Sequence, residues 1–201
     1  GDEAVLIDGQ EKILAVLPLF HIYALSVIMT FGIAGGYEII LHPKFELEAV
    51  MKDLNKKKPT VFPGVPTMYM AIASHPKIKE YDLSSLKFCA SGGAPLPFEV
   101  QEQFQRVTGC RLLEGWGMTE TSPSGTSTPM TDKRVAGAAG VPLPGIEIRI
   151  FGVDDKSKIM PTGEIGEIGI KGPNVMKGYW NKPEATAESF VDGFFLSGDT
   201  G

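Results

Sequence analysis

The chain has 201 residues, of which 43% are hydrophobic and 21% charged. That balance is typical of a globular chain with one sizeable core, or with a core and a small second domain. The formal net charge is −5 at pH 7, so the composition offers no basic surface for nucleic acid and excludes it as the expected partner.

Cysteine usage and apolar run lengths restrict the class of protein further. The two cysteines, Cys89 and Cys110, are too few for a disulfide framework and fit a reducing, cytoplasmic compartment. We interpret both as small buried apolar residues. The longest apolar stretch covers residues 24–34, which is shorter than the ~18–20 residues that a membrane span needs. No transmembrane segment is therefore predicted.

The first two thirds of the chain alternates strand-like and helical patterns. Short apolar runs bounded by Gly or Pro predict strands at 13–17, 37–41, 60–62, 87–90 and 111–114. Helical spacing predicts a buried helix over 22–34 and further helices from 46, around 68–72 and from 97 to 108. Pro63 and Gly64 are expected to stop the third strand. This alternation predicts an α/β fold, a mostly parallel sheet with flanking helices.

The pattern changes after about residue 131. Residues 146–150 and 167–171 alternate polar and apolar side chains between Pro/Gly turns, which predicts a small antiparallel β-barrel subdomain. We therefore expect an α/β subdomain over 1–134 and a β-barrel-like subdomain over 135–201. Both are expected to be incomplete pieces of a longer protein, because residue 1 lies in a polar loop and no element closes the second subdomain.

Two glycine-containing segments follow predicted strands. Residues 91–95 read Ser-Gly-Gly-Ala-Pro, and residues 115–117 read Gly-Trp-Gly. Ligands of parallel sheets lie outside the carboxyl ends of the strands, glycines allow a flat ring to approach the backbone, and Trp116 offers a stacking face. Adenine could lie between the backbone of Gly93 and Ala94 and this ring. On the residues alone, ordinary turns with a core tryptophan are an equally good interpretation.

Residues 115–121, Gly-Trp-Gly-Met-Thr-Glu-Thr, resemble the Tyr-Gly-x-Thr-Glu signature of the adenylate-forming enzymes. These include acyl-CoA synthetases, luciferases and peptide-synthetase adenylation domains. Residues 18–21 resemble the family's upstream histidine motif, and residues 91–95 its adenine loop. Residues 163–173 and 178–186 are similar to its barrel signature, and residues 197–199 to its ribose-binding segment. Five motifs in the family's order make the resemblance specific.

The resemblance implies a role for each matching residue. The implied nucleotide-binding residues are Gly92, Gly93, Ala94, Pro95, Glu114, Gly115, Trp116, Gly117, Met118, Thr119 and Asp199. Trp116 would stack on adenine in the place usually held by tyrosine, and Asp199 would accept hydrogen bonds from the ribose hydroxyls.

The implied catalytic residues are His21, Thr119 and Glu120. His21 would lie where the acyl carboxylate and the α-phosphate meet, although alone it reads as an ordinary residue at a helix start. Thr119 would meet the phosphates, and Glu120 would be the Mg²⁺ ligand. His42 and His75 match no motif and are expected in loops or on the surface.

The implied activity is that of an ATP-dependent acid–thiol ligase. A carboxylic acid would react with ATP to give an acyl-AMP, and coenzyme A would then displace AMP. Residues 60–67 and 81–86 look similar to bacterial fatty-acid ligases, which favours a fatty or medium-chain acid over an aryl or dicarboxylic acid. The resemblance leaves open an oligomer and a peripheral membrane contact of the whole protein.

The sequence departs from the family pattern at two elements, and two rival functions fit it less well. The family's Ser/Thr/Gly-rich phosphate loop and its late lysine have no counterpart in residues 1–201, so this chain alone is expected not to turn over. A non-catalytic nucleotide-binding remnant is the alternative of another class; retention of Thr119, Glu120 and Asp199 argues against it. A dinucleotide dehydrogenase is disfavoured because no G-x-G-x-x-G follows a strand.

Overall fold

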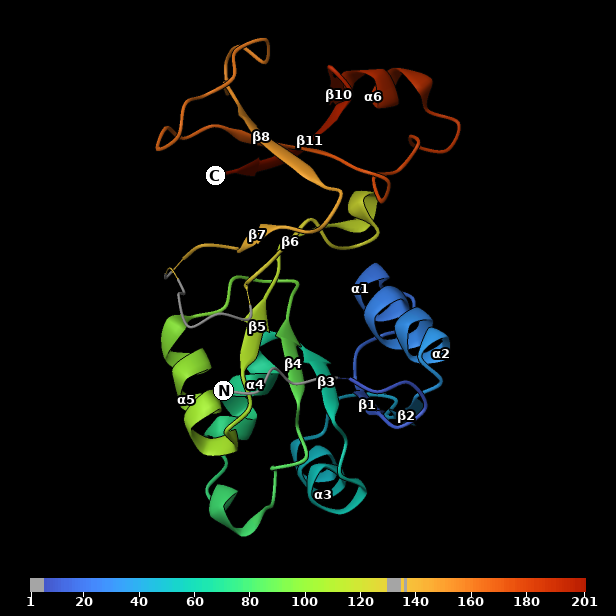
Figure 1. Cartoon of the computed structure of the whole chain (residues 1–201), viewed down its shortest axis with the longest axis vertical. Coiled ribbons are helices and arrows are strands. Elements are labelled where there is room, and N and C mark those ends of the chain that lie inside the picture. Colours follow the sequence, from blue (N-terminus) through green and yellow to red (C-terminus); the bar gives the residue numbers. More distant parts are fainter. Residues whose placement is uncertain (1–5, 130–134, 136) are drawn as a thin grey trace.

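The chain folds into an α/β lobe followed by a β-sheet lobe, as the computed structural model in Figure 1 shows. The structure describes residues 6–129, 135 and 137–201. The five strands of the first sheet are β1 (Lys12–Ala15), β2 (Glu38–Leu41), β3 (Val61–Gly64), β4 (Phe88–Ser91) and β5 (Leu112–Glu114). All are parallel, in the order β2-β1-β3-β4-β5. The predicted parallel α/β fold is confirmed.

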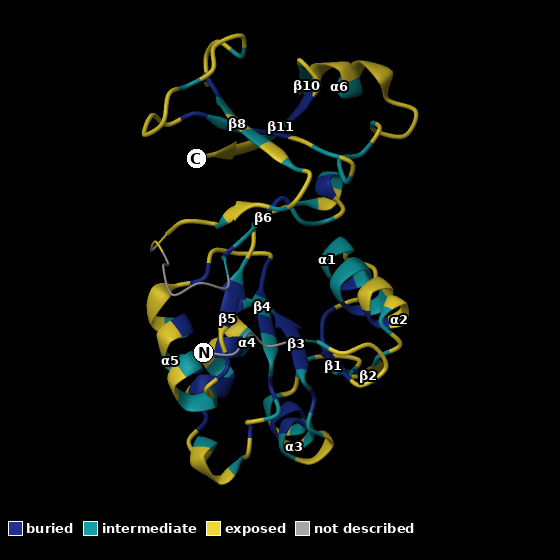
Figure 2. Cartoon of the chain, viewed as in Figure 1, coloured by how far each residue is buried: buried dark blue, intermediate teal, exposed yellow. Residues whose placement is uncertain are grey.

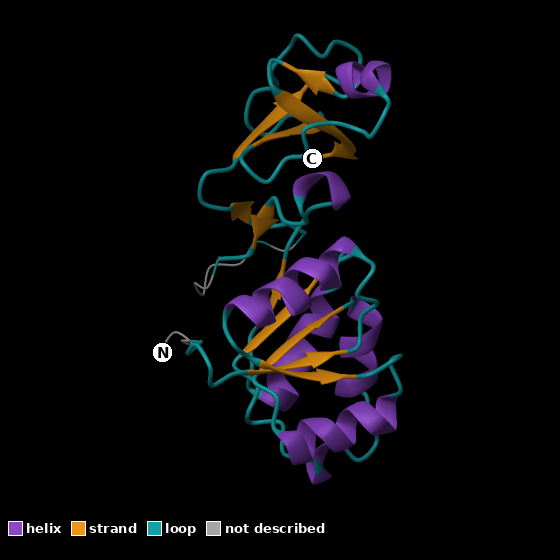
Figure 3. Ribbon diagram, turned by 90° about the vertical axis from the view of Figure 1, so that its right-hand side faces the viewer, coloured by secondary structure: helices purple, strands orange, loops and turns teal. Residues whose placement is uncertain are grey.

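The period of two along each strand sends alternate side chains into two apolar clusters. Leu14 of β1 packs under α3 (Leu47–Lys57), α4 (Pro66–Ala73) and α5 (Phe98–Thr108). Its neighbours Ile13 and Ala15 pack on the opposite face. There a continuous helical segment covers them, made of α1 (Ile22–Ala24), the π-helical η1 (Leu25–Thr30) and α2 (Phe31–Ala34). Figure 3 shows the helices on both sides of the sheet.

The helix over residues 22–34 is less buried than its composition predicted. Only Ala24, Ile28 and Gly32 are buried, one residue in four along a single stripe. Phe31 and Ile33 are exposed, as the colours of α2 in Figure 2 indicate. The prediction of a buried helix was wrong because only one side of this segment contacts the sheet.

Strand β3 runs through the proline that was expected to stop it. Pro63 and Gly64 are in register with Ala90 and Ser91 of β4. On the other side, β1 pairs with β3 only at Val61. A proline is tolerated in a strand where no ladder partner requires its N–H, and Pro63 lies beyond that last β1 pairing.

Helix α5 supplies hydrogen bonds to β5 at the edge of the sheet. The Nε2 of Gln101 donates to the carbonyl of Leu112, and the N–H of Leu112 donates to Oε1 of Gln105 at 3.0 Å. Below them, Phe104 packs edge-on against Tyr69, with ring centroids 4.9 Å apart. These contacts fix α5 and β5 relative to each other, and both adjoin the segments that the sequence singled out.

The second lobe contains a four-stranded antiparallel sheet in the order β10-β11-β9-β8. Its strands are β8 (Glu147–Phe151), β9 (Glu167–Lys171), β10 (Phe190–Val191) and β11 (Phe194–Thr200), with α6 (Pro183–Glu188) before β10. The predicted strands at 146–150 and 167–171 are confirmed as β8 and β9, whereas β10 and β11 were not assigned from sequence. A small two-stranded sheet, β6 (Thr126–Ser127) with β7 (Val141–Pro142), precedes this lobe.

The expected subdomain boundary between residues 134 and 135 falls at a gap in the described chain. Residues 130–134 and 136 lie outside the described residues, so the division into 1–134 and 135–201 stays a prediction. Among the described residues, no helix has both the length and the apolar character to cross a bilayer.

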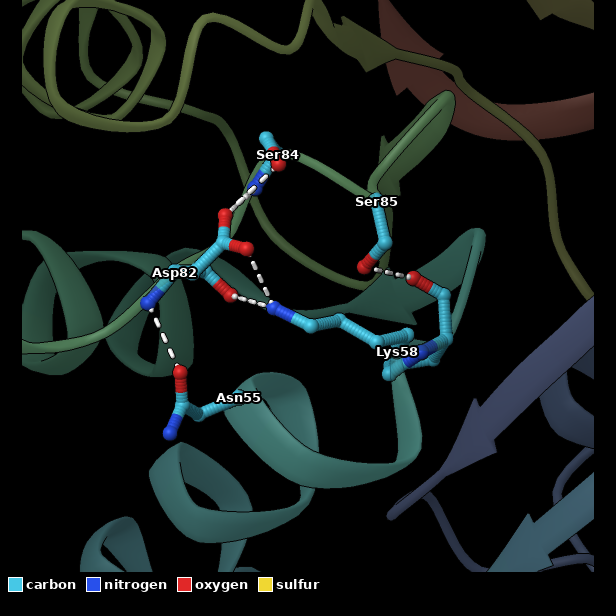
Figure 4. Close-up of polar contacts among 6 residues, drawn as sticks. Asn55, Lys58, Asp82, Ser84 and Ser85 are labelled. Carbon is cyan, nitrogen blue, oxygen red and sulfur yellow. Dashed lines mark hydrogen bonds and ion pairs between the residues drawn. The ribbon is translucent and has the colours of Figure 1, made fainter.

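The fatty-acid-ligase-like segment around residues 81–86 has a clear structural role. Figure 4 shows Lys58, at the left-handed end of α3, with its ammonium bonded to the Asp82 carboxylate at 2.5 Å. Asp82 also accepts from the N–H of Ser84 at 3.0 Å and donates its own N–H to Asn55 at 2.9 Å. The hydrogen bonds from Lys58 and Ser84 hold the pKa of Asp82 well below its usual range. This cluster joins the end of α3 to the turn that follows the short 3₁₀ helix η2 (Ile78–Glu80).

The two histidines outside the motifs are less exposed than expected. His75 is 4% exposed; its Nδ1 accepts from the N–H of Lys77 at 3.1 Å, and its Nε2 lies 3.1 Å from Oε1 of Glu48. His42 lies 2.9 Å from the Asp53 carboxylate. His75 lies in the loop just after α4, as one of the two expectations had it, but its ring is buried because it bonds the turn that follows.

The buried carboxylate of Glu11 gives a stability prediction. Glu11 is 1% exposed, and its Oε1 accepts from Lys87 Nζ at 2.8 Å and from the N–H of Ile7 at 2.9 Å. Burial alone would raise the pKa of Glu11, but hydrogen bonds from Lys87, Thr60 and the N–H of Ile7 lower it overall. We expect Lys87→Met to lower the free energy of unfolding by about 2–3 kcal/mol, because the carboxylate loses its cation.

Urea unfolding as a function of pH tests this expectation. A lowered pKa gives stability above the ordinary pKa of glutamate, about 4.3, that is lost as pH falls through the folded pKa. The cost of Lys87→Met should therefore be largest at neutral pH and shrink in acid. The matched control is Lys12→Met, which breaks the exposed 3.0 Å ion pair with Glu38 and should cost about 1 kcal/mol or less. Equal costs at neutral pH would contradict the prediction.

Candidate functional site

An apolar cavity of about 390 Å³ lies at the carboxyl end of the parallel sheet. Val61, Phe88 and Ala90 line it from the strands, and Tyr23 and Val27 line it from the helix over residues 22–34. Along each strand these residues alternate with residues that pack under α3, α4 and α5 on one face of the sheet. The cavity therefore lies on the opposite face, where the helix over residues 22–34 does not cover the strands. The chain order reverses between β1 and β3, the position where open parallel sheets bind ligands.

Most of the predicted site residues meet at this cavity or beside it. Those that line it are His21, Gly92, Gly93, Glu114, Gly115, Trp116, Gly117 and Met118. A second, more open hollow between the lobes is lined by Met118, Glu120 and Asp199. Ala94, Pro95 and Thr119 line neither hollow. The fold thus brings together motifs from four separate stretches of the chain.

The glycines of the motifs have local structural reasons. Gly93 has a φ of +77°, which favours glycine. A Cβ on Gly92 would lie 3.1 Å from the ring of Tyr23, and one on Gly117 would lie 1.8 Å from the carbonyl oxygen of Pro123. Packing within the chain therefore accounts for these glycines, and their contact with a nucleotide stays a prediction.

Two residues at the rim hold the loops in place. Oε1 of Glu114 accepts from the N–H of Leu96 at 2.8 Å, which ties the loop after β4 to the end of β5. His21 begins α1, and its Nδ1 accepts from the N–H of Tyr23 at 3.1 Å. This cap agrees with the interpretation of His21 as an ordinary residue at a helix start. The His21 side chain also lines the cavity.

Tyr23 is a cavity residue that the sequence reasoning missed. Its hydroxyl donates to the carbonyl of Ala90 at 2.7 Å, which fixes the ring against the sheet. Burial raises the pKa of Tyr23, so the side chain is a neutral wall of the cavity at ordinary pH. Its position two residues after His21, the last residue of the upstream motif, was the available signal.

Trp116 joins the two lobes. Its indole Nε1 donates to Oδ2 of Asp199 at 2.8 Å across 83 residues of sequence. The six-membered edge of the ring lies over Gly125, where a Cβ would come within 2.8 Å of Cζ3. The two predicted nucleotide residues with the most specific roles, adenine stacking and ribose binding, are therefore in direct contact.

The segment around Glu120 is held by the second lobe. Glu120 lies in the 3₁₀ turn η3 (Thr119–Thr121), and its Oε1 accepts from the hydroxyl of Tyr179 at 3.0 Å. The N–H of Met176 donates to the Glu120 carbonyl at 2.8 Å, and Nδ2 of Asn174 donates to the carbonyl of Thr121 at 2.6 Å. Burial and the hydrogen bond to Glu120 raise the pKa of Tyr179. No spacing rule could have linked residues so far apart.

Comparison with known proteins adds an independent observation. Residues 2–180 match the family described as AMP-binding enzyme, which is most of the chain. The chain belongs to this family. The resemblance that the motifs carried is thereby confirmed.

Individual AMP-binding enzymes share the fold and much of the sequence. The chain is 44% identical over 194 residues to a long-chain-fatty-acid–CoA ligase of Bacillus subtilis (strain 168), covering 96% of the chain and 34% of the ligase. It is 42% identical to a feruloyl-CoA synthase of an Amycolatopsis species, covering 95% of the chain and 38% of the synthase. The chain therefore spans little more than a third of these relatives.

Solved structures agree with these relatives. MatB from Rhodopseudomonas palustris is 36% identical and superposes with a TM-score of 0.89 without ligand and 0.87 with ATP bound. The match covers 97% of the chain and 38% of MatB. Both lobes described here are thus those of an AMP-binding enzyme.

The described residues around Glu120 fit Mg²⁺ in the mode in which a substrate supplies further ligands. Among the described residues, no three His, Cys, Asp or Glu side chains form a group that could enclose a metal. Protein-bound Mg²⁺ is commonly held by one or two carboxylates together with substrate phosphates and water. Glu120 suits that mode, because it is a single carboxylate with one oxygen bonded to the Tyr179 hydroxyl. The described residues do not form a metal site made of protein ligands alone.

Proposed function

We propose that the whole protein is an ATP-dependent acid–thiol ligase that forms an acyl-AMP from a fatty or medium-chain carboxylic acid and transfers the acyl group to coenzyme A. The observation that carries this is that Trp116 lines the apolar cavity and donates its indole N–H to Asp199, which lines the more open hollow beside it. An alkyl chain fits the cavity, and a nucleotide fits its rim. The reacting carboxylate would then lie between them, beside His21.

The proposed roles are those that the family resemblance implies for these residues. Trp116 and the Gly93–Ala94 backbone bind adenine, and Asp199 accepts hydrogen bonds from the ribose hydroxyls. Thr119 donates to a phosphate, and His21 stabilises the meeting point of carboxylate and α-phosphorus. Attack by the carboxylate oxygen on the α-phosphorus releases pyrophosphate, and attack by the thiol sulfur on the acyl carbon then releases AMP. Mg²⁺ held through Glu120 would offset the repulsion between the two reacting anions.

The lining of the cavity supports a monocarboxylic acid. No lysine or arginine is among the described residues that line it, so a second carboxylate would meet no permanent cation there. An unpaired carboxylate in an apolar site is strongly disfavoured. A dicarboxylic acid is therefore the weaker alternative. An aryl acid is the stronger one, because Tyr23, Phe31 and Phe88 offer aromatic walls and a feruloyl-CoA synthase is a relative.

Pyrophosphate release by the full-length enzyme tests this proposal. Octanoate, palmitate, ferulate and malonate should be compared at equal concentration, with and without coenzyme A. We expect the alkanoates to give the highest kcat/KM and malonate the lowest. A preference for ferulate would replace the fatty acid by an aryl acid, and no pyrophosphate release with any acid would favour the non-catalytic alternative.

The 201-residue chain by itself provides a separate test. It is expected to give no acyl-CoA at ordinary rates, since it spans little more than a third of its relatives. Titration calorimetry with a non-hydrolysable ATP analogue and with NAD distinguishes the nucleotide classes. Tighter binding of NAD would contradict the proposal.

Tyr179→Phe should change the Mg²⁺ dependence of the reaction. Loss of the hydroxyl removes the 3.0 Å hydrogen bond that orients the Glu120 carboxylate. Residues that orient a metal ligand typically contribute 10–100-fold to metal affinity, so we expect the half-saturating Mg²⁺ concentration to rise about tenfold. Tyr37→Phe, in the loop before β2, is the matched control and should leave that concentration unchanged. An equal shift in both variants would refute the role of Tyr179.

A further inference from the structure

A hydrogen bond joins Trp116 and Asp199, two residues proposed to hold the nucleoside. Trp116 follows β5 in the first lobe, and Asp199 lies near the end of β11 in the second. The distance from Nε1 to Oδ2 is 2.8 Å, as in charge-assisted hydrogen bonds. The indole N–H therefore points at the carboxylate, in the plane of the ring, while the ring faces are perpendicular to that direction.

The backbone of Asp199 is fixed independently of Trp116. The preceding Gly198 has a φ of +76°, and its N–H donates to Oε1 of Glu167 at 2.9 Å. Glu167 in turn pairs with Lys156. The N–H of Asp199 itself donates to Oγ of Ser197 at 3.1 Å. What remains to be set at this position is the rotation of the carboxylate.

The backbone of Trp116 is also held. Its N–H donates to Oγ1 of Thr126 at 3.3 Å, and its carbonyl accepts from the N–H groups of Gly125 and Thr126 at 2.8 and 3.0 Å. The ring packs over Gly125 beside Ile170. Because the backbone of each partner is held by hydrogen bonds that do not involve the other, the indole N–H can act as a fixed reference for the Asp199 side chain.

We propose that Trp116 is a positioning residue for Asp199: its indole N–H orients the carboxylate so that the 2′- and 3′-hydroxyls of the ribose are recognised together. A carboxylate offers about four acceptor sites, and the N–H occupies one of them. The remaining sites can accept both hydroxyls, while the same indole presents a face to adenine. This inference rests on the proposed nucleotide function, and it makes ribose recognition depend on a residue whose expected role was only stacking.

Binding of AMP and of 2′,3′-dideoxy-AMP to the full-length enzyme, measured by calorimetry, tests the inference. The wild type should prefer AMP by about tenfold or more, the effect of one or two hydrogen bonds. In Trp116→Phe this preference should fall to about threefold or less. Both ligands carry the same adenine, so any change in stacking affects both affinities and cancels in the ratio.

The comparison variant is Asp199→Ala. It should abolish the preference for AMP, and the double variant Trp116→Phe/Asp199→Ala should show no further loss, because the tryptophan acts through the aspartate. An unchanged preference in Trp116→Phe overturns the positioning role and leaves the proposed function intact. Failure of the wild-type enzyme to bind AMP at all would instead overturn the proposed function.

A spectroscopic measurement keeps the inference testable if Trp116→Phe folds poorly. The 201-residue chain contains two tryptophans, Trp116 and the 89% exposed Trp180. Its ¹H–¹⁵N spectrum should therefore show two indole N–H signals, which Trp180→Phe assigns. Asp199→Ala should move the Trp116 signal to the upfield position of an unbonded indole and leave the Trp180 signal in place. A Trp116 signal that does not respond would show that the hydrogen bond is absent, and would overturn the proposal.

Discussion

Glu120→Gln is expected to lower the rate of acyl-adenylate formation by the full-length enzyme about 10²–10³-fold. Metal-assisted charge stabilisation contributes several kcal/mol to reactions of this kind, and each 1.4 kcal/mol is about tenfold in rate. A glutamine keeps the shape of the side chain and an acceptor for the Tyr179 hydroxyl, which bonds Glu120 at 3.0 Å. It removes the negative charge that would hold Mg²⁺. AMP binding without metal should therefore change little.

Pre-steady-state pyrophosphate release at several Mg²⁺ concentrations is the measurement for Glu120. The deficit should shrink as Mg²⁺ is raised, because the loss is one of metal affinity. Glu188→Gln is the matched control, since the exposed Glu188 lines the same open hollow and loses the same charge. A similar loss in Glu188→Gln would mean that the effect comes from the overall negative charge of the hollow and not from a metal ligand. If the loss of rate in Glu120→Gln does not change with Mg²⁺ concentration, Glu120 is not a Mg²⁺ ligand.

The parallel sheet could be predicted because its strands carry a strong local signal. Buried parallel strands are continuous apolar runs bounded by Gly or Pro, because successive side chains such as Ile13 and Leu14 enter the apolar clusters on opposite faces of the sheet. The same reasoning placed the glycine segments after β4 and β5 at the ligand-binding edge. The identity of the ligand, however, came from the resemblance and then from the family match.

The contacts that organise the site could not be predicted from spacing. Tyr179 reaches Glu120 across 59 residues, and Asn174 reaches Thr121 across 53. Such contacts depend on how the second lobe packs on the first, which leaves no periodic pattern in the sequence. The prediction that the helix over residues 22–34 is buried was wrong for a related reason. Its apolar composition is local, but its burial depends on how much of the sheet lies beneath it.

Helix α5 shows how the core and the site are connected, and Phe104→Ala should reveal it. Phe104 is fully buried and packs edge-on against Tyr69, whose hydroxyl lies 2.7 Å from the carbonyls of Phe62 and Ala90. Truncation of a buried phenylalanine costs about 3–5 kcal/mol. Since small proteins are stable by only about 5–15 kcal/mol in total, this is a large share of the folding free energy.

Urea unfolding followed by circular dichroism measures this loss, with Phe98→Ala as the matched control on the same helix. Phe98 is 43% exposed, so its truncation should cost about 1 kcal/mol or less. Phe104→Ala should also loosen the rim of the cavity, because α5 connects the loop after β4 to β5 and bonds Leu112 through Gln101 and Gln105. Amide exchange should then rise at residues 92–96 and 115–118 in this variant alone. Equal losses of stability in both variants would mean that α5 does not depend on the Phe104–Tyr69 contact. The binding rim would then have to be held mainly by the second lobe, through Asp199 and Tyr179.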